Sequence, residues 1–495
     1  MRQVILLFAL LASLLLSAQE DFQIVKGNCL PDQEGGGSHR ALGRYKLQKP
    51  RKDWDATKTY KQLVILVEFA DLSFAEAHDK AFYEKVFNIF DESAYEGKKR
   101  YGQGSVADYF RTQSGGKFNL QFDIVGPYKV TANAKSEDKY KRAELKEATT
   151  LMVADQTERD FSQYDWDDNG YIEQVVYVLA GPTGNVTGNE GYLHPNTYSF
   201  TSVETPNGKR ISNCTSSTEL WTIESGTNCG IGTICHEFTH SLGLPDIYPV
   251  DGGSNTDYSI CDEWELMDGG NFTNYGWCPP NFTAMEKMLL GWQQPIVLTE
   301  PCTITGMKPV SEGGEVYQVK KSDDEYIMIE NHQWTKWDAG LPGQGLVVTY
   351  VNYIQERWRN NTVNTDKSHL LYDIIHADGK DFVTWQKELG TTSKYANSGC
   401  MHKVHLSTSP YPYGEVNTIA DWELSDITVD ADGLVSFKYK GGAPSGIASP
   451  LTSSPSHLLT PAYFDLQGRR IEAPVRGQLY LVRKVDGSIC KYLYK

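Results

Sequence analysis

One short motif in the sequence has residue types and a spacing that suit metal-dependent hydrolysis. His236, Glu237 and His240 form the pattern H-E-x-x-H within IGTICHEFTHSLGLPDIY (231–248). On a helix, residues four apart lie on one face, so both imidazoles can bind the same ion. A catalytic zinc ion bound by histidines keeps one position open for water, and a neighbouring carboxylate can take a proton from that water. The pattern therefore predicts a zinc peptidase with Glu237 as general base and acid.

An isolated H-E-x-x-H can also be a chance pattern on a helix surface, and its context decides between the two interpretations. Apolar residues precede the motif, and Gly243 follows it where a helix would end, because glycine readily adopts the left-handed conformation of a C-terminal turn. We therefore interpret the motif as a zinc site. For the third ligand, Asp246 follows the turn and is our first choice, and two later carboxylates, Glu265 and Glu286, stay open as alternatives.

The composition is ordinary for a globular protein and disfavours one class of function. A chain of 495 residues is long enough for roughly two to four domains. The net charge is −16, and no block of lysine or arginine offers a face for phosphate groups. We therefore expect no nucleic-acid partner.

The N-terminus reads as a signal peptide over residues 1–18. Arg2 supplies the positive charge, residues 4–16 are apolar, and Ser17 and Ala18 are small residues before a cleavage site. The apolar stretch is about 13 residues long, short of the roughly 20 that cross a bilayer. We expect a secreted or cell-surface protein without a membrane span, followed by a short propeptide or flexible arm at 19–57.

Nine cysteines remain to be placed, and an odd number leaves at least one unpaired. Cys29 in the arm is either a latency device that caps the metal or an ordinary cysteine, the second being favoured. Because exported proteins form disulfides, we expect one or two among the cysteines that flank the motif in sequence. These are Cys214, Cys229, Cys261 and Cys278.

Residues 58–296 alternate between strand and helix patterns, which predicts a mixed α/β layer around the motif. The predicted strands are 62–69, 117–125 and 174–179, and the predicted helices are 74–90, 105–114, 138–156 and 282–292. The polar stretch 184–217 suits a cleft wall or an edge strand, with His194 as a weak site candidate. Met267 in the turn 261–270 suits a position beneath the metal, or it simply fills a gap in the core.

The segment DWDDNGYIE (165–173) offers oxygen ligands at the spacing of the first part of a calcium loop. Position 12 of that loop is Val176, where an EF-hand has a glutamate, so the pattern is truncated. A turn without metal explains the same residues equally well. The candidate calcium ligands are Asp165, Asp167, Asn169 and Glu173.

The remainder of the chain reads as β structure. Strand patterns separated by turns predict a β-rich domain at 297–441, packed on the catalytic unit. A linker rich in glycine, proline and serine follows at 442–461, and short strand patterns at 462–495 predict a small β tail. The tryptophans of this region either line a substrate or carbohydrate surface or pack in the core. They are Trp334, Trp337, Trp358 and Trp385.

Several segments together resemble the M6 (immune inhibitor A-like) metallopeptidases over roughly residues 60–355. They are HEFTHSLGLPDIY, SVADYFRTQSGGKF, DWDDNGYIEQVVYVLAG and WELMDGG. The resemblance implies an α/β (α+β) zincin-like catalytic domain and a secreted zinc-dependent endopeptidase. His236 and His240 are then zinc ligands, and Glu237 is the general base and acid. The long propeptide usual in the family is not evident, and Thr349 and Tyr350 stand where the family leads us to expect a histidine.

The C-terminal tail is similar to the sorting modules of type IX secretion, which implies a secretion machinery of the outer membrane as a partner. Two other functions stay open. One is a surface adhesin or binding protein that has the fold without the activity, although the intact motif speaks against it. The other is a zinc hydrolase of non-peptide amides, which would use the same activated water.

Overall fold

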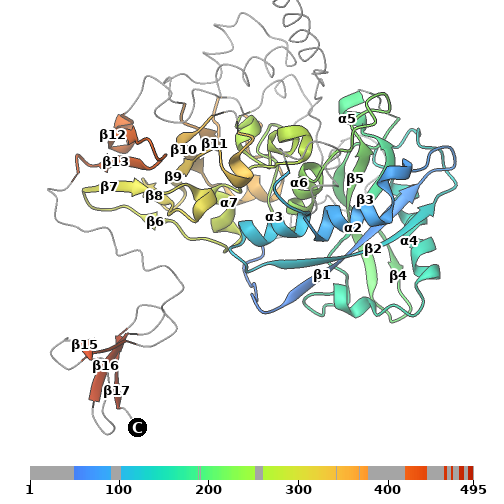
Figure 1. The fold of residues 1–495 in the computed structure, drawn as a ribbon, viewed down its shortest axis with the longest axis horizontal. Helices are drawn as coiled ribbons and strands as arrows, with labels where there is room; N and C mark the ends of the chain where they lie inside the picture. Colours follow the sequence, from blue (N-terminus) through green and yellow to red (C-terminus); the bar gives the residue numbers. More distant parts are fainter. Residues whose placement is uncertain are drawn as a thin grey trace, which may run out of the picture.

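The computed structural model describes residues 50–90, 102–187, 189, 191–250, 260–341, 343–366, 368–376 and 418–442, and the backbone of strands β14 to β17 (Figure 1). The predicted signal peptide, most of the arm with Cys29, the linker beyond residue 442, and Trp385 lie outside these residues. Among the described residues, no helix has both the length and the apolar character needed to cross a membrane.

The N-terminal half is built around the first sheet. Apart from its last strand, its strands are parallel. Across the sheet they are β2 (Asn119–Lys129), β1 (Thr59–Glu68), β3 (Val175–Pro182), β5 (Arg210–Leu220) and the antiparallel edge strand β4 (Asn196–Glu204). The sequence predicted β1, β2 and β3 within a few residues.

Helices cover both faces of this sheet, which explains why β1 is apolar on both sides. Val64 and Leu66 belong to a core that includes residues of α2, α3 and α6. Leu63, Ile65 and Val67 belong to a second core, on the α4 side. The helices are α2 (Lys80–Asn88), α3 (Val106–Gln113), α4 (Arg142–Asp155), α5 (Gly184–Thr187), α6 (Gly232–Ser241), α7 (Ala284–Leu289) and α8 (Gln355–Arg359).

Helix starts agree with the capping residues in the sequence. Ser105 caps α3 and Thr283 caps α7, each in a reciprocal capping box with the carboxylate three residues later. The helix predicted at 282–292 is shorter than expected, because the chain leaves helical geometry at Gly291, which has a positive φ of 70°. Short 3-10 helices include η1 (Glu76–His78), η3 (Phe161–Tyr164), η4 (Asp262–Trp264), η5 (Gly270–Gly276), η6 (Val310–Glu312), η7 (Lys336–Asp338) and η9 (Ala420–Trp422).

The C-terminal half is built from sheets, as the strand patterns predicted. The second sheet runs β11 (Tyr372–Ile374), β10 (Gly345–Asn352), β9 (Glu325–His332), β8 (Tyr317–Lys320), β6 (Ile296–Val297). The third runs β12 (Leu424–Val429), β13 (Val435–Tyr439), β7 (Cys302–Met307). The tail sheet runs β15 (Arg470–Ile471), β14 (Ala462–Phe464), β16 (Leu479–Arg483), β17 (Ile489–Leu493).

The hydrophobic core does not stop at the predicted boundary between residues 296 and 297. Met328 of β9 and Val347 of β10 belong to the same buried cluster as Phe238 of α6. The opposite face of the second sheet, with Ile329 and Val348, packs with the third sheet instead. Figure 1 shows α3, α6 and α7 between the first and second sheets. The second sheet is therefore part of the packing around α6.

Burial corrects the disulfide expectation and decides between the two alternatives for two of the tryptophans. The cysteines whose side chains are described are all free, so the predicted disulfides among Cys214, Cys229, Cys261 and Cys278 are wrong. These four are buried as small apolar side chains on separate elements, and proximity in sequence to the motif did not make them neighbours in space. Trp337 and Trp358 are buried in the core and line no surface.

Candidate metal centre

Helix α6 carries the H-E-x-x-H motif through the middle of the core. Every residue from Gly232 to His240 is buried. The helix starts against η5 so closely that a Cβ on Gly232 would lie 1.9 Å from the main-chain oxygen of Asn271. Farther along, the Phe238 ring packs on Phe110 of α3, with ring centroids 4.9 Å apart. A helix held on all sides gives its side chains fixed directions, as a metal centre requires.

The two histidines of α6 are each oriented by a main-chain carbonyl. His236 Nδ1 lies 2.7 Å from the oxygen of Leu266, and His240 Nδ1 lies 2.8 Å from the oxygen of Leu244. Because a carbonyl only accepts hydrogen bonds, each Nδ1 must donate, which leaves each Nε2 as the nitrogen that can bind a metal.

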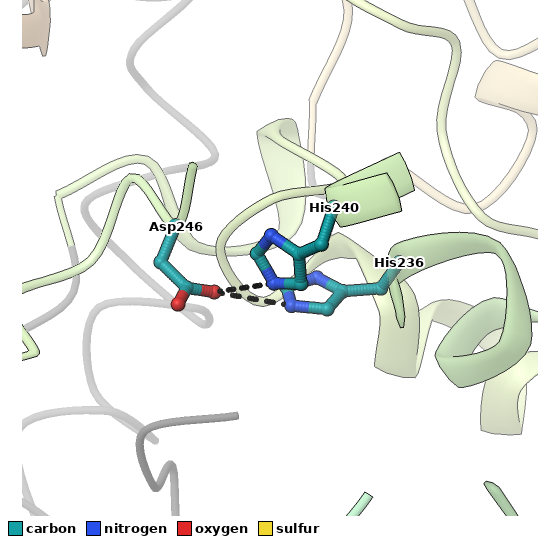
Figure 2. Close-up of side chains that lie close together, drawn as sticks. All are labelled: His236, His240 and Asp246. Atoms are coloured by element: carbon teal, nitrogen blue, oxygen red, sulfur yellow. Dashed lines mark hydrogen bonds and ion pairs between the residues drawn. The ribbon is translucent and has the colours of Figure 1, made fainter. Parts of the chain in front are cut away.

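Asp246 completes a compact set of donors with these two nitrogens. Its Oδ1 lies 3.2 Å from His236 Nε2 and 3.3 Å from His240 Nε2 (Figure 2). Gly243, with a φ of 101°, makes the turn that brings the aspartate back to the helix. The three potential ligand atoms lie within 4.8 Å of one another and are buried. Two imidazoles and one carboxylate at this separation fit a single small cation such as Zn²⁺.

The electrostatics of the site also favour a cation. Burial opposes a charge on His236, but its hydrogen bond to Asp246 and the nearby charge of Glu237 outweigh burial and raise its pKa to about 9. Burial likewise opposes a charge on Asp246, yet the adjacent His240 and His236 hold the pKa of this carboxyl well below its ordinary value. A proton on His236 therefore pairs with Asp246 at the point where a metal ion would sit.

Asn361 is a partner of Asp246 that the sequence analysis missed. Its Nδ2 donates to Asp246 Oδ2 over 2.7 Å, and its Oδ1 accepts from the Asp246 main-chain N–H over 2.6 Å. The two residues are 115 positions apart in the chain. No local pattern around Asn361 signals this contact, because it depends on how the segment after α8 folds against the loop that carries Asp246.

The carboxylate of Glu237 is buried and contacts the edge strand of the first sheet. Thr197 Oγ1, on β4, lies 3.2 Å from Glu237 Oε2 and 2.6 Å from the Glu237 main-chain oxygen. Thr197 belongs to the polar stretch that we expected to form a cleft wall or an edge strand. β4 is an edge strand, and within the described residues its only paired neighbour is β5.

Glu265 and Glu286 lie together, and neither belongs to the group of donors around the histidines. Tyr372 Oη donates to Glu265 Oε2 over 3.0 Å, and Glu286 Oε2 accepts from the main-chain N–H of Thr283 over 2.8 Å. Burial and the neighbouring Glu286 raise the pKa of Glu265 well above its ordinary value. The structure thus brings Asp246, rather than either glutamate, to the histidines.

The two other candidate site residues, Met267 and His194, lie outside the group of metal donors. Met267 is fully buried, and its main-chain oxygen accepts from the N–H of Ile247, which fastens the residue after Asp246 to this turn. His194 is buried against Gly184, the first residue of the polar stretch, and does not join the donor group on α6.

The predicted calcium loop forms a second group of oxygen donors. Ligand atoms of Asp165, Asp167 and Glu173 lie within 4.8 Å of one another. The Asn169 side chain instead accepts from the N–H of Tyr171. The Lys209 ammonium lies 2.8 Å from Asp165 Oδ2, so a cation of the chain itself already balances part of the acidic charge. The geometry leaves both a calcium loop and a metal-free turn open.

A buried centre of two helix histidines and a carboxylate, beside a glutamate, is the arrangement of a metallopeptidase. Residues 49–293 match the family model described as Immune inhibitor A peptidase M6, catalytic domain. Immune inhibitor A of Bacillus thuringiensis subsp. alesti is 24% identical over 278 residues, which cover 46% of this chain and 39% of that protein. The match thus spans less than half of that relative's length. Together these similarities support an M6 peptidase catalytic domain in residues 49–293.

Proposed function

We propose that the protein is a zinc-dependent endopeptidase that cleaves protein or peptide substrates. The observation that carries this proposal is the convergence of His236 Nε2, His240 Nε2 and Asp246 Oδ1 on one buried point, with Glu237 next to the first histidine. These three residues would hold the zinc ion. Bound there, zinc would polarise the scissile carbonyl and acidify the attacking water.

The residues of the chain supply the remaining steps. Glu237 accepts a proton from the attacking water and passes it to the leaving amine. The hydroxyl of Thr197 fixes the orientation of Glu237 from the edge strand. An extended substrate can pair with the edge of β4 that faces away from β5, where the described residues place no further strand; this would align the substrate backbone next to Glu237.

The direct test of the proposal is Glu237→Gln. This change keeps the size of the side chain but removes the base, so hydrolysis of casein should fall by about 10³-fold or more. One acid–base group contributes about 10²–10⁴-fold, and Glu237 serves in two proton transfers. Zinc content, measured by atomic absorption, should stay at one ion per chain because the ligands are intact. Wild-type protein that neither binds zinc nor loses activity with a chelator would contradict the proposal.

Export is a second part of the proposal. The signal-peptide pattern at 1–18 supports secretion, and the resemblance of the tail to sorting modules supports passage through a type IX machinery. The strands of the tail pair into an antiparallel sheet of their own. Expression with and without residues 443–495 in a host that has this machinery, followed by assay of the culture medium, tests the role of the tail.

A further inference from the structure

Asn361 makes a two-point contact with Asp246 from a part of the chain that lies beyond the family match. It follows α8, in the connection that leads to β11, whereas the match ends at residue 293. One hydrogen bond holds the Asp246 carboxylate and the other holds the Asp246 main chain. Both side chains are buried, so these bonds are formed without competition from bulk water.

Because of this contact, the two carboxylate oxygens of Asp246 have different partners. Oδ1 faces the histidine nitrogens, whereas Oδ2 accepts from Asn361 Nδ2. A carboxylate held in this way presents one oxygen to a metal and cannot rotate to present the other. Without the Asn361 amide, Oδ2 would be a buried acceptor lacking this donor, and the carboxylate would be free to turn.

Each of the three donors then has its own orienting partner. The partners of the histidines, the Leu266 and Leu244 carbonyls, lie within 30 residues of the helix. The partner of Asp246 is the only one of the three that comes from the C-terminal half. Partners of this kind fix the direction of metal ligands, and their loss typically costs affinity for the metal.

The connection that carries Asn361 is itself tied to the site. Asn364 Nδ2 donates to the main-chain oxygen of Ile247 over 2.9 Å and to that of Tyr372 over 2.8 Å. Asn364 Oδ1 accepts from the N–H groups of Leu371 and Tyr372. The chain segment of the third ligand is therefore fastened to the start of β11.

We propose that Asn361 is the positioning residue for the third zinc ligand, and that the connection from α8 to β11 is part of the metal centre. This inference rests on the proposed function, in which Asp246 binds zinc. It extends the centre beyond residues 49–293, into the segment that follows α8.

The test compares Asn361→Gly with Asn360→Gly in the full chain. Asn361 has a φ of 54°, which glycine adopts without strain. The first variant therefore removes the side-chain hydrogen bonds without straining the backbone. Asn360 ends α8 and has no side-chain bond to Asp246, so the second variant controls for the flexibility of glycine. We expect the zinc dissociation constant, measured by competition with a chromophoric chelator, to rise about 10–100-fold for Asn361→Gly and to stay within about twofold for Asn360→Gly.

The visible absorption spectrum of the Co²⁺-substituted protein gives a readout that a purely structural role would not change. We expect its bands to shift in Asn361→Gly, because the Asp246 carboxylate takes a new direction. Should that variant fail to fold, Asn361→Asp serves instead. It is isosteric, keeps the acceptor for the Asp246 N–H and places an oxygen where the donor was, so it too should shift the Co²⁺ bands.

The outcomes separate the two proposals. Wild-type zinc affinity together with an unchanged Co²⁺ spectrum in a folded Asn361 variant would overturn the role of Asn361 and leave the peptidase proposal standing. Wild-type protein that binds no zinc would overturn both. A loss of thermal stability without any change in zinc affinity or spectrum would make Asn361 a structural residue only.

Discussion

The residues at the centre differ in how far their roles follow from local sequence. The histidines and Glu237 are set by helical spacing, and Asp246 is set by a turn that Gly243 makes possible. Thr197 and Asn361 contact these residues from distant segments, and nothing near them in sequence indicates it. Long-range partners of this kind require the packed fold to be known.

At the residue scale, Thr197→Val should lower kcat by about tenfold without changing zinc affinity. The change removes a hydroxyl next to the Glu237 carboxylate, and one hydrogen bond to a charged group contributes about 1.5 kcal/mol or more. Steady-state hydrolysis of a fluorogenic peptide measures kcat, and chelator competition measures zinc affinity. Ser199→Ala is the matched control, because it removes an exposed hydroxyl two residues along the same strand. Equal kcat values for the two variants would contradict the prediction.

At the scale of elements, the turn 261–270 and helix α7 meet through a buried pair of carboxylates, Glu265 and Glu286. Burial and the neighbouring Glu286 raise the pKa of Glu265, and Glu286 in turn completes the capping box of α7. Neither Glu265 Oε1 nor Glu286 Oε1 accepts from a donor in the described part of the chain, and the two side chains share a hydrogen bond, which two carboxyl groups can form only when one of them carries a proton. We infer that one proton, carried by Glu265, joins the two carboxylates.

This proton predicts a specific pH dependence of stability. The folded state keeps Glu265 protonated, whereas the unfolded chain releases the proton above a pKa of about 4.5, so this group stabilises the fold fully only below that pH. As pH rises further, its contribution should fall by about 1.4 kcal/mol per pH unit until the folded-state pKa is reached. Glu265→Gln removes this dependence and leaves a side chain that can still donate to Glu286.

Urea unfolding at pH 5 and pH 8 tests the prediction. The free energy of unfolding of Glu265→Gln minus that of wild type should be larger at pH 8 than at pH 5, because only wild type loses stability as the pH rises. Glu312→Gln, at an exposed position, should show no such trend. A difference between Glu265→Gln and wild type that is the same at both pH values would contradict a shared proton.

The elements themselves were largely predictable, and their contacts were not. Alternating and continuous apolar runs placed β1, β2, β3 and most strands of the second half, because each pattern reports which faces are buried. The disulfide prediction failed because it concerned contacts between distant segments, which no local pattern reports. Pairing depends on the distance between Cα atoms, and the spacing of Cys214, Cys229, Cys261 and Cys278 in sequence does not contain that distance.

At the scale of the whole molecule, one core joins the first and second sheets around α6. A chain that ends at residue 296 should therefore fail to fold, because it lacks Met328, Val347 and Trp358, which cover the same cluster as Phe238. A chain that ends at residue 442 keeps all of them and should unfold cooperatively. Near-UV circular dichroism and zinc affinity distinguish the two. A fragment ending at 296 that folds and binds zinc like the full chain would contradict the prediction and also the role of Asn361.

Sequence order sets the order in which the centre can form during synthesis. Both histidines, Glu237 and Asp246 leave the ribosome more than 100 residues before Asn361. A nascent chain thus carries both histidines and Asp246 before Asn361, the proposed partner of Asp246, has been synthesised. If Asn361 has the proposed role, metal capture with full affinity would wait until the segment after α8 has been made and folded, and a chain exported unfolded, as we propose, would gain its proposed activity only after export.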